Sequence, residues 1–224
     1  MQLDPGPSYP QAQIIVSELM VLTNTLAAKW VLEHDIPLIF RTQNITLPQE
    51  NAGVWDQAPD IYRLIKSMGP SLMQTTAKKH ATLGVEAYAP LTSPLRRYID
   101  FMNMAQIISF LEHGQAVWEK DELQRRLVSL NARLDVVSKV QRMRPRYWKF
   151  LFFRQQAKKQ QFDAILVEAD ARMVTVSLFQ EQLFLRAPRT LFGEKLFCGQ
   201  QFRLRLGKVD PLNGEITVLE AMEL

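Results

Sequence analysis

Cysteine and clustered aspartate are scarce in this sequence. Cys198 is the only cysteine among 224 residues, which excludes an intramolecular disulfide and a zinc site built from several cysteines. We expect a reducing compartment, with Cys198 as a small buried apolar residue. No two aspartates are adjacent, and the acidic residues are scattered along the chain. The sequence therefore offers no local carboxylate cluster of the kind that holds catalytic divalent metals.

Long apolar runs are missing as well. No run approaches the roughly 18 residues that a membrane span requires. The opening residues have neither the basic region nor the apolar core of a signal peptide. We therefore expect a cytoplasmic protein without membrane contact. A hydrophobic content of 47% and a charged content of 22% are typical of a soluble globular protein, and the net charge of +4 permits an anionic partner without requiring one.

The first helix is predicted to begin at Pro10. Apolar residues recur there at steps of three and four, the period of one helix face: Ile15, Leu19, Leu22, Leu26 and Trp30. Between residues 14 and 22 only Ser17 and Glu18 are polar, so we expect this helix to be buried on most sides. A buried Glu18 needs a partner, either within the core or across a polar channel.

Shorter elements follow. Residues 35–41 predict a buried strand or an extended segment, residues 59–68 a short helix, and residues 69–90 loops with a short strand. A second long helix is predicted to begin at Ser93 and to end before Gly114. The next helix, from about residue 123, is expected to be interrupted at Pro145 and to resume over residues 146–158.

The pattern changes near residue 160. Apolar residues now fall largely at every second position, with turn sequences such as residues 210–214 between them, which predicts five short strands. Five strands in about 64 residues suit a small barrel of the OB type, and a small sheet packed on the helices is the alternative. We expect an α+β protein with a mostly helical domain at residues 1–159 and an OB-like domain at residues 160–224.

The segment Thr92–Asp100 places two arginines where a helix is predicted to begin. With Ser93 as the N-cap and a proline after it, Arg96 and Arg97 fall beside free N–H groups at the positive end of the helix dipole. A cation there is unfavourable by roughly 0.3–1 kcal/mol. A phosphate, however, suits N–H and guanidinium groups together. Either the arginines bind an anion or Arg96 pairs with Asp100 at the surface, and the sequence leaves both open.

A basic stretch lies between Lys139 and Lys159, where eight lysines and arginines occur without an acidic residue and aromatic residues interleave. Such a stretch is either a solvated helix face or a surface that contacts phosphates. Arg144 and Arg146 are its candidate contacts to a nucleic-acid backbone.

Residues 88–100, Tyr-Ala-Pro-Leu-Thr-Ser-Pro-Leu-Arg-Arg-Tyr-Ile-Asp, resemble the signature near the end of the catalytic domain in ribonuclease II and ribonuclease R type exoribonucleases, the RNB family. Three further segments are similar to family segments in the same order: residues 15–20 with Asn24, residues 36–41, and residues 80–84. The resemblance spans nearly the whole chain. Because this family carries an OB-type RNA-binding module at its C-terminus, the resemblance favours the barrel.

The resemblance implies a 3′→5′ hydrolytic exoribonuclease that acts on single-stranded RNA. The family holds Mg²⁺ with aspartates that lie close together, upstream of the segments found here. Since this sequence has no such cluster, it resembles the C-terminal part of the catalytic domain, with the upstream half as a possible partner. By the same resemblance Arg96 and Arg97 would hold the phosphate near the scissile bond, and Glu18 would line the RNA channel at the terminal nucleotides.

The remaining candidates for RNA binding are His80, Thr92 and Ser93. An exposed structural histidine is an equal alternative for His80. The sequence departs from the family pattern at three positions. Many members carry a histidine or another polar residue in place of Pro90, a histidine in place of Met104 and a glutamate in place of Gln141. These departures leave open a non-catalytic RNA-binding or regulatory protein, or a helical interaction domain that never meets nucleic acid.

Overall fold

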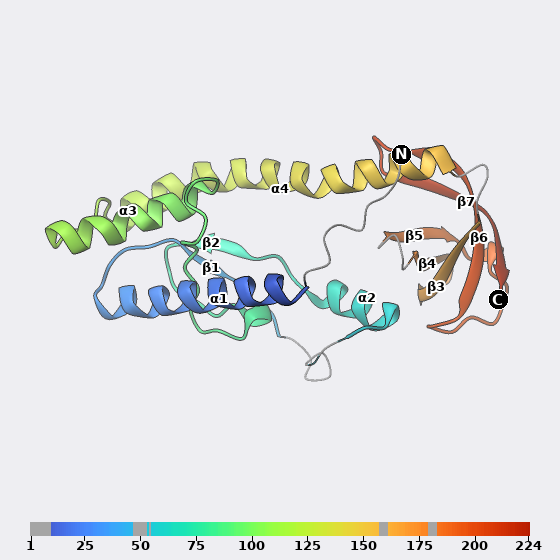
Figure 1. Cartoon of the computed structure of the whole chain (residues 1–224), viewed down its shortest axis with the longest axis horizontal. Helices are drawn as coiled ribbons and strands as arrows, with labels where there is room; N and C mark the ends of the chain where they lie inside the picture. The colour runs from blue at the N-terminus through green and yellow to red at the C-terminus, as the bar shows by residue number, and fades with distance from the viewer. Residues whose placement is uncertain (1–9, 47–52, 54, 157–160, 179–182) are drawn as a thin grey trace. The chain divides into compact units, whose positions relative to one another are not determined.

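The computed structural model describes residues 10–46, 53, 55–156, 161–178 and 183–224 (Figure 1). Two compact units divide the chain. One holds the described residues of 6–50 and 68–136, and the other holds those of 51–67 and 137–224. The predicted domain boundary between residues 159 and 160 lies outside the described residues and stays a prediction.

The first unit is mostly helical, as predicted. Its elements are α1 (Pro10–Glu33), β1 (Phe40–Thr42), β2 (Leu72–Gln74), the single turn η2 (Ala81–Leu83), α3 (Tyr98–His113) and the N-terminal half of α4 (Lys120–Gln156). β1 and β2 pair antiparallel, with Arg41 opposite Met73. Of the strand or extended segment predicted over residues 35–41, only the last two residues belong to a strand, since β1 begins at Phe40.

Two small apolar clusters form the core of this unit. One joins the C-terminal half of α1 to the segment before β1, through Ala28, Val31, Ile36 and Leu38. The other joins α3 to α4, through Ile99, Met102, Leu123 and Leu127. α3 ends where the sequence predicts, because Gly114 has a left-handed φ of 72° and its N–H donates to the Phe110 carbonyl.

The prediction that α1 is buried on most sides is wrong. Only Asn24, Ala28 and Val31 are buried, all in its C-terminal half. The apolar residues of its other faces are 47–61% exposed: Ile14, Ile15, Val16, Leu19, Leu22, Leu26 and Leu32. The periodicity identified an apolar helix correctly, but the described part of the chain covers one face of it only.

α1 also bears on the expectation of no membrane contact. By length and composition alone it is long and apolar enough to cross a membrane, a property that core helices and signal sequences share. Because Asn24 is held in a buried hydrogen-bond network, described below, α1 is part of a folded unit. The absence of membrane contact stays a prediction.

α4 is one helix of 37 residues, with Pro145 inside it. The predicted interruption at Pro145 is therefore wrong. Proline removes one helical hydrogen bond, but residues 135–146 are all exposed, so water can satisfy the carbonyl that loses its partner.

The second unit contains a five-stranded antiparallel sheet. Its strands are β3 (Gln161–Ala169), β4 (Met173–Leu178), β5 (Leu183–Pro188), β6 (Gln201–Asp210) and β7 (Glu215–Glu223), in the order β5-β4-β3-β6-β7. The short η3 (Arg189–Leu191) follows β5. α2 (Ala58–Ser67) joins this unit, because Tyr62 and Lys66 bind the Glu168 carboxylate on β3.

The sheet curls into a half-barrel around one apolar core. β5 and β7 contact each other, although the hydrogen-bonded pairings within the described strands do not join them. The fully buried Phe150 and Phe153 of α4 pack into the core beside Phe162 and Phe202. This arrangement agrees with the predicted five-stranded tail and with the predicted α+β class.

Cys198 differs from its prediction. It lies exposed before β6, and its thiol donates to the Val167 carbonyl at 3.4 Å.

Candidate functional site

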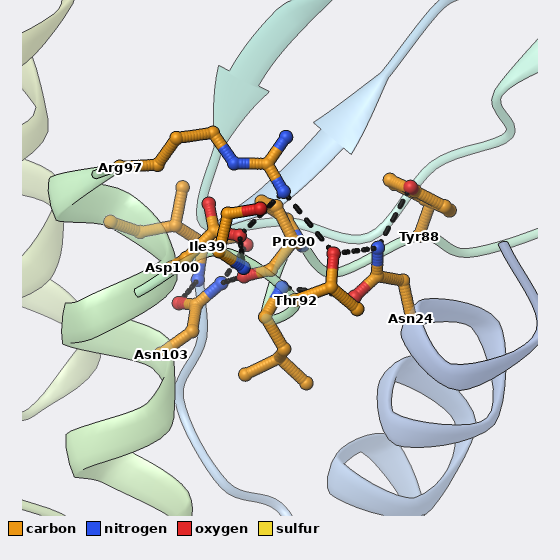
Figure 2. A network of polar contacts seen from close by, with 10 residues as sticks. Asn24, Ile39, Tyr88, Pro90, Thr92, Arg97, Asp100 and Asn103 are labelled. Atoms are coloured by element: carbon orange, nitrogen blue, oxygen red, sulfur yellow. Dashed lines mark hydrogen bonds and ion pairs between the residues drawn. The ribbon is translucent and has the colours of Figure 1, made fainter. Parts of the chain in front are cut away.

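The candidate site is the segment of residues 88–97, which α1 holds from one side. Asn24 makes the contacts. Its side-chain oxygen accepts the Leu91 N–H at 2.9 Å, and its amide nitrogen donates to the Tyr88 hydroxyl at 2.8 Å and reaches Thr92 Oγ1 at 3.5 Å (Figure 2). Asn24 is fully buried, so these hydrogen bonds fix the segment against α1 without competition from water.

α3 holds the same segment from the other side through Asn103. This fully buried side chain accepts the Ile39 N–H at 2.9 Å and donates to the Ile39 and Pro90 carbonyls at 2.8 and 3.0 Å (Figure 2). Both ends of the amide are therefore satisfied, and the segment is joined to the approach to β1 as well as to α3.

The predicted helix start at Ser93 is wrong. Residues 93–97 form a turn in which the Ser93 carbonyl accepts the N–H groups of Arg96 and Arg97 at 3.2 and 2.9 Å, and α3 begins only at Tyr98. A Ser-Pro pair opens a turn as readily as a helix, because proline has the φ that either requires. Arg97 is the residue before the helix, with an extended backbone.

The free N–H groups that were expected beside the arginines are consequently occupied. Those of Arg96 and Arg97 close the turn, and the Ser93 N–H donates to Asp100 Oδ2 at 2.9 Å. Asp100 lies in the first turn of α3, where a carboxylate also complements the helix dipole.

The structure separates the two arginines. Arg97 donates from Nη2 to Asp100 Oδ2 at 2.7 Å and to Thr92 Oγ1 at 3.2 Å (Figure 2). The Asp100 side chain is 2% exposed and that of Arg97 38%. The surface pair considered for Arg96 and Asp100 is thus made by Arg97 instead, and it is half buried.

Arg96 is exposed, and among the described residues its guanidinium has no hydrogen-bond or ion-pair partner. Arg96 lies in the turn of residues 93–97. Hydrogen bonds of Asn24 with Leu91, of Asn103 with Pro90 and of Asp100 with Ser93 hold this part of the chain in place, and we call it braced for that reason. A partnerless cation on a braced segment can accept an incoming phosphate without first breaking a bond within the protein.

The other predicted site residues have varied surroundings. Thr92 and Ser93 belong to the braced segment, whereas Glu18 is exposed on α1. Arg144 is exposed on α4. Arg146 donates to the Gly214 carbonyl at 3.0 Å and lies over the Phe150 ring, so it joins α4 to the turn between β6 and β7.

His80 is buried, at 4% exposure, rather than an exposed structural histidine. Its ring contacts Tyr88, with centroids 5.8 Å apart, and Nδ1 lies 3.4 Å from Thr82 Oγ1, while Nε2 is buried without a hydrogen-bond partner. Burial lowers the pKa of His80 from its ordinary value of 6.5, and the positive charge of Arg41 lowers that pKa further.

The residues described here do not fit the Mg²⁺ that the family resemblance implies. In residues 10–46, 53, 55–156, 161–178 and 183–224, no three His, Cys, Asp or Glu side chains gather in a group able to hold a metal ion. Asp100, the one carboxylate of the candidate site, is already bound by Arg97 and the Ser93 N–H.

Sequence reasoning overlooked the asparagines that brace the segment. Asn24 was noted only as part of a similar segment, and Asn103 was not singled out. One signal was available for Asn103: together with Asp100 and Gln106 it interrupts an apolar stretch in the first part of α3, and all three are buried. Buried amides of this kind must satisfy backbone groups.

The two arginines are expected to differ in their effect on stability. Arg97→Ala leaves the buried Asp100 carboxylate without its cation and should lower the free energy of unfolding by roughly 2 kcal/mol, below the usual range for a buried pair because Arg97 is partly solvated. Arg96→Ala should change it by less than about 0.5 kcal/mol. Urea denaturation followed by circular dichroism measures both. Equal losses would contradict this division of roles.

His80 makes stability depend on pH. Its pKa is lowered in the folded state, so on acidification the unfolded chain binds the proton first. This contribution is therefore complete above about pH 7 and is lost as the pH falls below 6.5. The urea midpoint of unfolding should change less between pH 7 and pH 5 in His80→Gln than in the unaltered protein. The exposed control His113→Gln should keep the pH dependence of the unaltered protein. An unchanged pH profile in His80→Gln would refute the assignment.

Comparison with known sequences places the candidate site in a family. Residues 6–113 match the RNB domain. The chain is 26% identical over 213 residues to an uncharacterized ribonuclease of Synechocystis and 27% identical over 219 residues to the chloroplastic/mitochondrial ribonuclease II of Arabidopsis thaliana. It is 23% identical over 221 residues to the mitochondrial exoribonuclease II of Saccharomyces cerevisiae. These matches cover 93%, 94% and 90% of this chain, which spans only 32%, 26% and 23% of those proteins.

Solved structures have the same fold. The Dss1 exoribonuclease of Candida glabrata matches 91% of this chain with a TM-score of 0.77 and 24% identity, over 28% of its own length. Ribonuclease R of Mycoplasma genitalium, in complex with ribose-methylated single-stranded RNA, matches 93% with a TM-score of 0.70 and 16% identity, over 42% of its length. Yeast Ssd1, a pseudonuclease, matches 92% with a TM-score of 0.67 and 12% identity, over 29% of its length.

The predicted cytoplasmic location is contradicted by these comparisons. The relatives from Saccharomyces cerevisiae and Schizosaccharomyces pombe are named as mitochondrial, and the Arabidopsis relative as chloroplastic or mitochondrial. A lone cysteine and the lack of a signal peptide are equally compatible with the interior of an organelle. Those sequence features therefore could not distinguish an organelle from the cytoplasm.

The predicted resemblance and the predicted fold class are both confirmed: residues 6–113 of this chain match the RNB domain, and its fold is that of the Dss1 exoribonuclease and ribonuclease R.

Proposed function

We propose that this chain is the C-terminal portion of a 3′→5′ hydrolytic exoribonuclease for single-stranded RNA. The observation that carries the proposal is Arg96, whose exposed guanidinium has no partner in the part of the chain that the structure describes, on a segment braced by Asn24, Asn103 and Asp100. Such a group can bind a phosphate of the RNA backbone and stabilise the charge that develops on its oxygens in the transition state.

The remaining residues of the segment position Arg96. Arg97 links Thr92 to Asp100, and the Ser93 carbonyl accepts the Arg96 N–H, so the turn that presents Arg96 is fixed at both ends. A preorganised turn lowers the entropic cost of ordering a long side chain around a ligand. In this proposal Arg97, Thr92 and Ser93 act through Arg96.

Glu18 and His80 enter the proposal differently. Glu18 is exposed and available to line an RNA channel at the terminal nucleotides. His80 is buried against Tyr88, so it would support the segment from beneath rather than contact RNA. Of the two basic candidates on α4, Arg144 has a solvent-facing charge, whereas Arg146 is bound to Gly214.

Hydrolysis of a phosphodiester also needs an activated water, which in this family is supplied with Mg²⁺. Since the described carboxylates form no metal group, the proposal assigns metal binding to a part of the RNB domain outside this chain. The short span of the match, 32% or less of the three relatives named above, is compatible with that division.

A non-catalytic RNA-binding or regulatory protein is the second candidate. Yeast Ssd1, described as a pseudonuclease, has the same fold, so the fold alone does not imply hydrolysis. The departures from the family pattern at Pro90, Met104 and Gln141 also favour this candidate. Pro90 is buried and its carbonyl binds Asn103, so that position has a structural role here.

RNA binding tests the role of Arg96. Arg96→Ala should weaken the affinity for single-stranded RNA roughly ten- to hundredfold, since a charge-assisted hydrogen bond is worth about 1.5–3 kcal/mol. Arg125→Ala, another exposed arginine without a described partner, is the matched control and should stay within about twofold. Fluorescence anisotropy at several salt concentrations measures both, and the slope against salt should be reduced in Arg96→Ala only. Equal affinities would remove Arg96 from the site.

Hydrolysis distinguishes the two candidate functions. This chain alone, with Mg²⁺ and 5′-labelled single-stranded RNA, should release no nucleotides. Addition of the neighbouring stretch of RNB domain from the same genome should restore shortening from the 3′ end, seen as a ladder on a denaturing gel. RNA binding without hydrolysis in the combined sample would favour the non-catalytic protein, and hydrolysis by this chain alone would contradict the assignment of metal binding elsewhere.

A further inference from the structure

Two aromatic side chains lie exposed at the start of α3, directly after the turn that carries Arg96. Tyr98 is 54% exposed and Phe101 is 51% exposed. Their rings are nearly parallel, with the centroids 6.1 Å apart and an angle of 22° between the planes. Because large aromatic side chains normally bury most of their surface, an exposed and parallel pair indicates a binding surface.

The helix fixes the direction in which this aromatic pair, Tyr98 and Phe101, points. The two residues are three apart, so at about 100° per residue they lie roughly 60° apart around α3. At the same angle per residue the buried residues of the helix are centred about 140° from the pair. These buried residues are Ile99, Asp100, Met102, Asn103 and Gln106. The hydrogen bonds of Asp100 and Asn103 that brace the candidate site therefore also hold the aromatic pair towards solvent.

The charge beside the aromatic pair is positive. Arg96 is exposed two residues before Tyr98, and its guanidinium has no partner among the described residues. Between Glu86 and Glu112 the sequence has one acidic residue, Asp100, which is buried and bound by Arg97. The surface thus combines flat apolar rings with a cation and presents no exposed carboxylate of its own.

A nucleotide of single-stranded RNA has the complementary pair of groups. Its base is flat and apolar on both faces, and its phosphate is an anion. Aromatic side chains bind unpaired bases by stacking, and arginine binds the phosphate through charge-assisted hydrogen bonds. Both groups occur here within six residues of the sequence, Arg96–Phe101, on one braced part of the chain.

We propose that Tyr98 and Phe101 form a stacking platform for one base of single-stranded RNA, next to the phosphate that Arg96 binds. The inference rests on the proposed function and names the part of the RNA that this surface recognises. A base within a duplex is paired and stacked on its neighbours, so the platform favours single strands. Every base has a flat face, so all four bases can bind, with adenine favoured over uracil because its ring system is larger.

Replacement of the rings by leucine separates stacking from general apolar contact. Tyr98→Leu with Phe101→Leu, the leucine variant, keeps an apolar surface but removes both flat rings. Tyr98→Phe keeps the ring and removes the hydroxyl only. Ile108→Ala is the matched control, because Ile108 is 46% exposed on the same helix. The probes are a fluorescein-labelled short oligoadenylate and the same oligonucleotide without bases, an abasic RNA. Fluorescence anisotropy in the absence of Mg²⁺ measures both affinities.

The leucine variant should bind the oligoadenylate roughly five- to hundredfold more weakly than the unaltered chain, which is the range for loss of one stacked base. Tyr98→Phe and Ile108→Ala should stay within about twofold, because neither removes a ring. The leucine variant and the unaltered chain should bind the abasic RNA equally. In an oligoadenylate that carries 2-aminopurine, the fluorescence of that base should be quenched by the unaltered chain and not by the leucine variant.

Three outcomes would overturn the platform. The first is equal affinity of the leucine variant and the unaltered chain for the oligoadenylate, and the second is an equal loss on the oligoadenylate and the abasic RNA. The third is a lower melting temperature of the leucine variant, which would mean that the rings pack within this chain. Light scattering that shows a dimer of the unaltered chain and a monomer of the leucine variant would assign the rings to a second copy and would overturn the proposal as well.

Arg96→Ala in the same assay keeps the platform and the proposed function distinguishable. This variant should bind both RNAs more weakly, because the abasic RNA retains its phosphates. A loss in Arg96→Ala without a loss in the leucine variant removes the platform and leaves the proposed function. Ring-dependent binding without hydrolysis in the presence of the neighbouring RNB stretch counts against hydrolysis alone. Failure of the unaltered chain to bind either RNA overturns both.

Discussion

The carboxylate of Asp100 is the interaction on which the candidate site depends. It is almost fully buried, and its Oδ2 accepts both the Ser93 N–H and an Arg97 N–H, so one oxygen joins the turn, the start of α3 and a guanidinium. A buried charge is tolerated only when it is paired in this way. Since Arg97 is committed to Asp100, the neighbouring Arg96 is left free in a turn that cannot easily rearrange.

The brace around residues 88–97 connects distant parts of the sequence. Asn24 comes from α1, Asn103 from α3, and the Ile39 groups that Asn103 binds precede β1. Three elements thus converge on one short segment through neutral amides, which satisfy backbone groups without adding charge near the site. Arg96 is then the exposed cation of residues 88–97, since Arg97 is paired with Asp100.

Local periodicity predicted the helices and the strand-rich tail well, because the periods of helices and strands depend on residues that are close together in the sequence. It could not predict where α3 begins, since Ser93 and Pro94 serve a turn and a helix equally, and the choice is made by Asp100 seven residues after Ser93. Nor could it tell that α1 has an uncovered face: a pattern of apolar residues specifies a face but not what packs on it. The family resemblance singled out residues 88–100 as a prediction, whereas the different contacts of Arg96 and Arg97 could be found only from coordinates.

The exposed thiol of Cys198 has a practical consequence. Because the chain contains no other cysteine, a maleimide dye reacts at one defined place, in the unit that contains the sheet. Fluorescence from that single label can report events in the sheet, while a tryptophan such as Trp30 supplies an intrinsic signal from the helical unit.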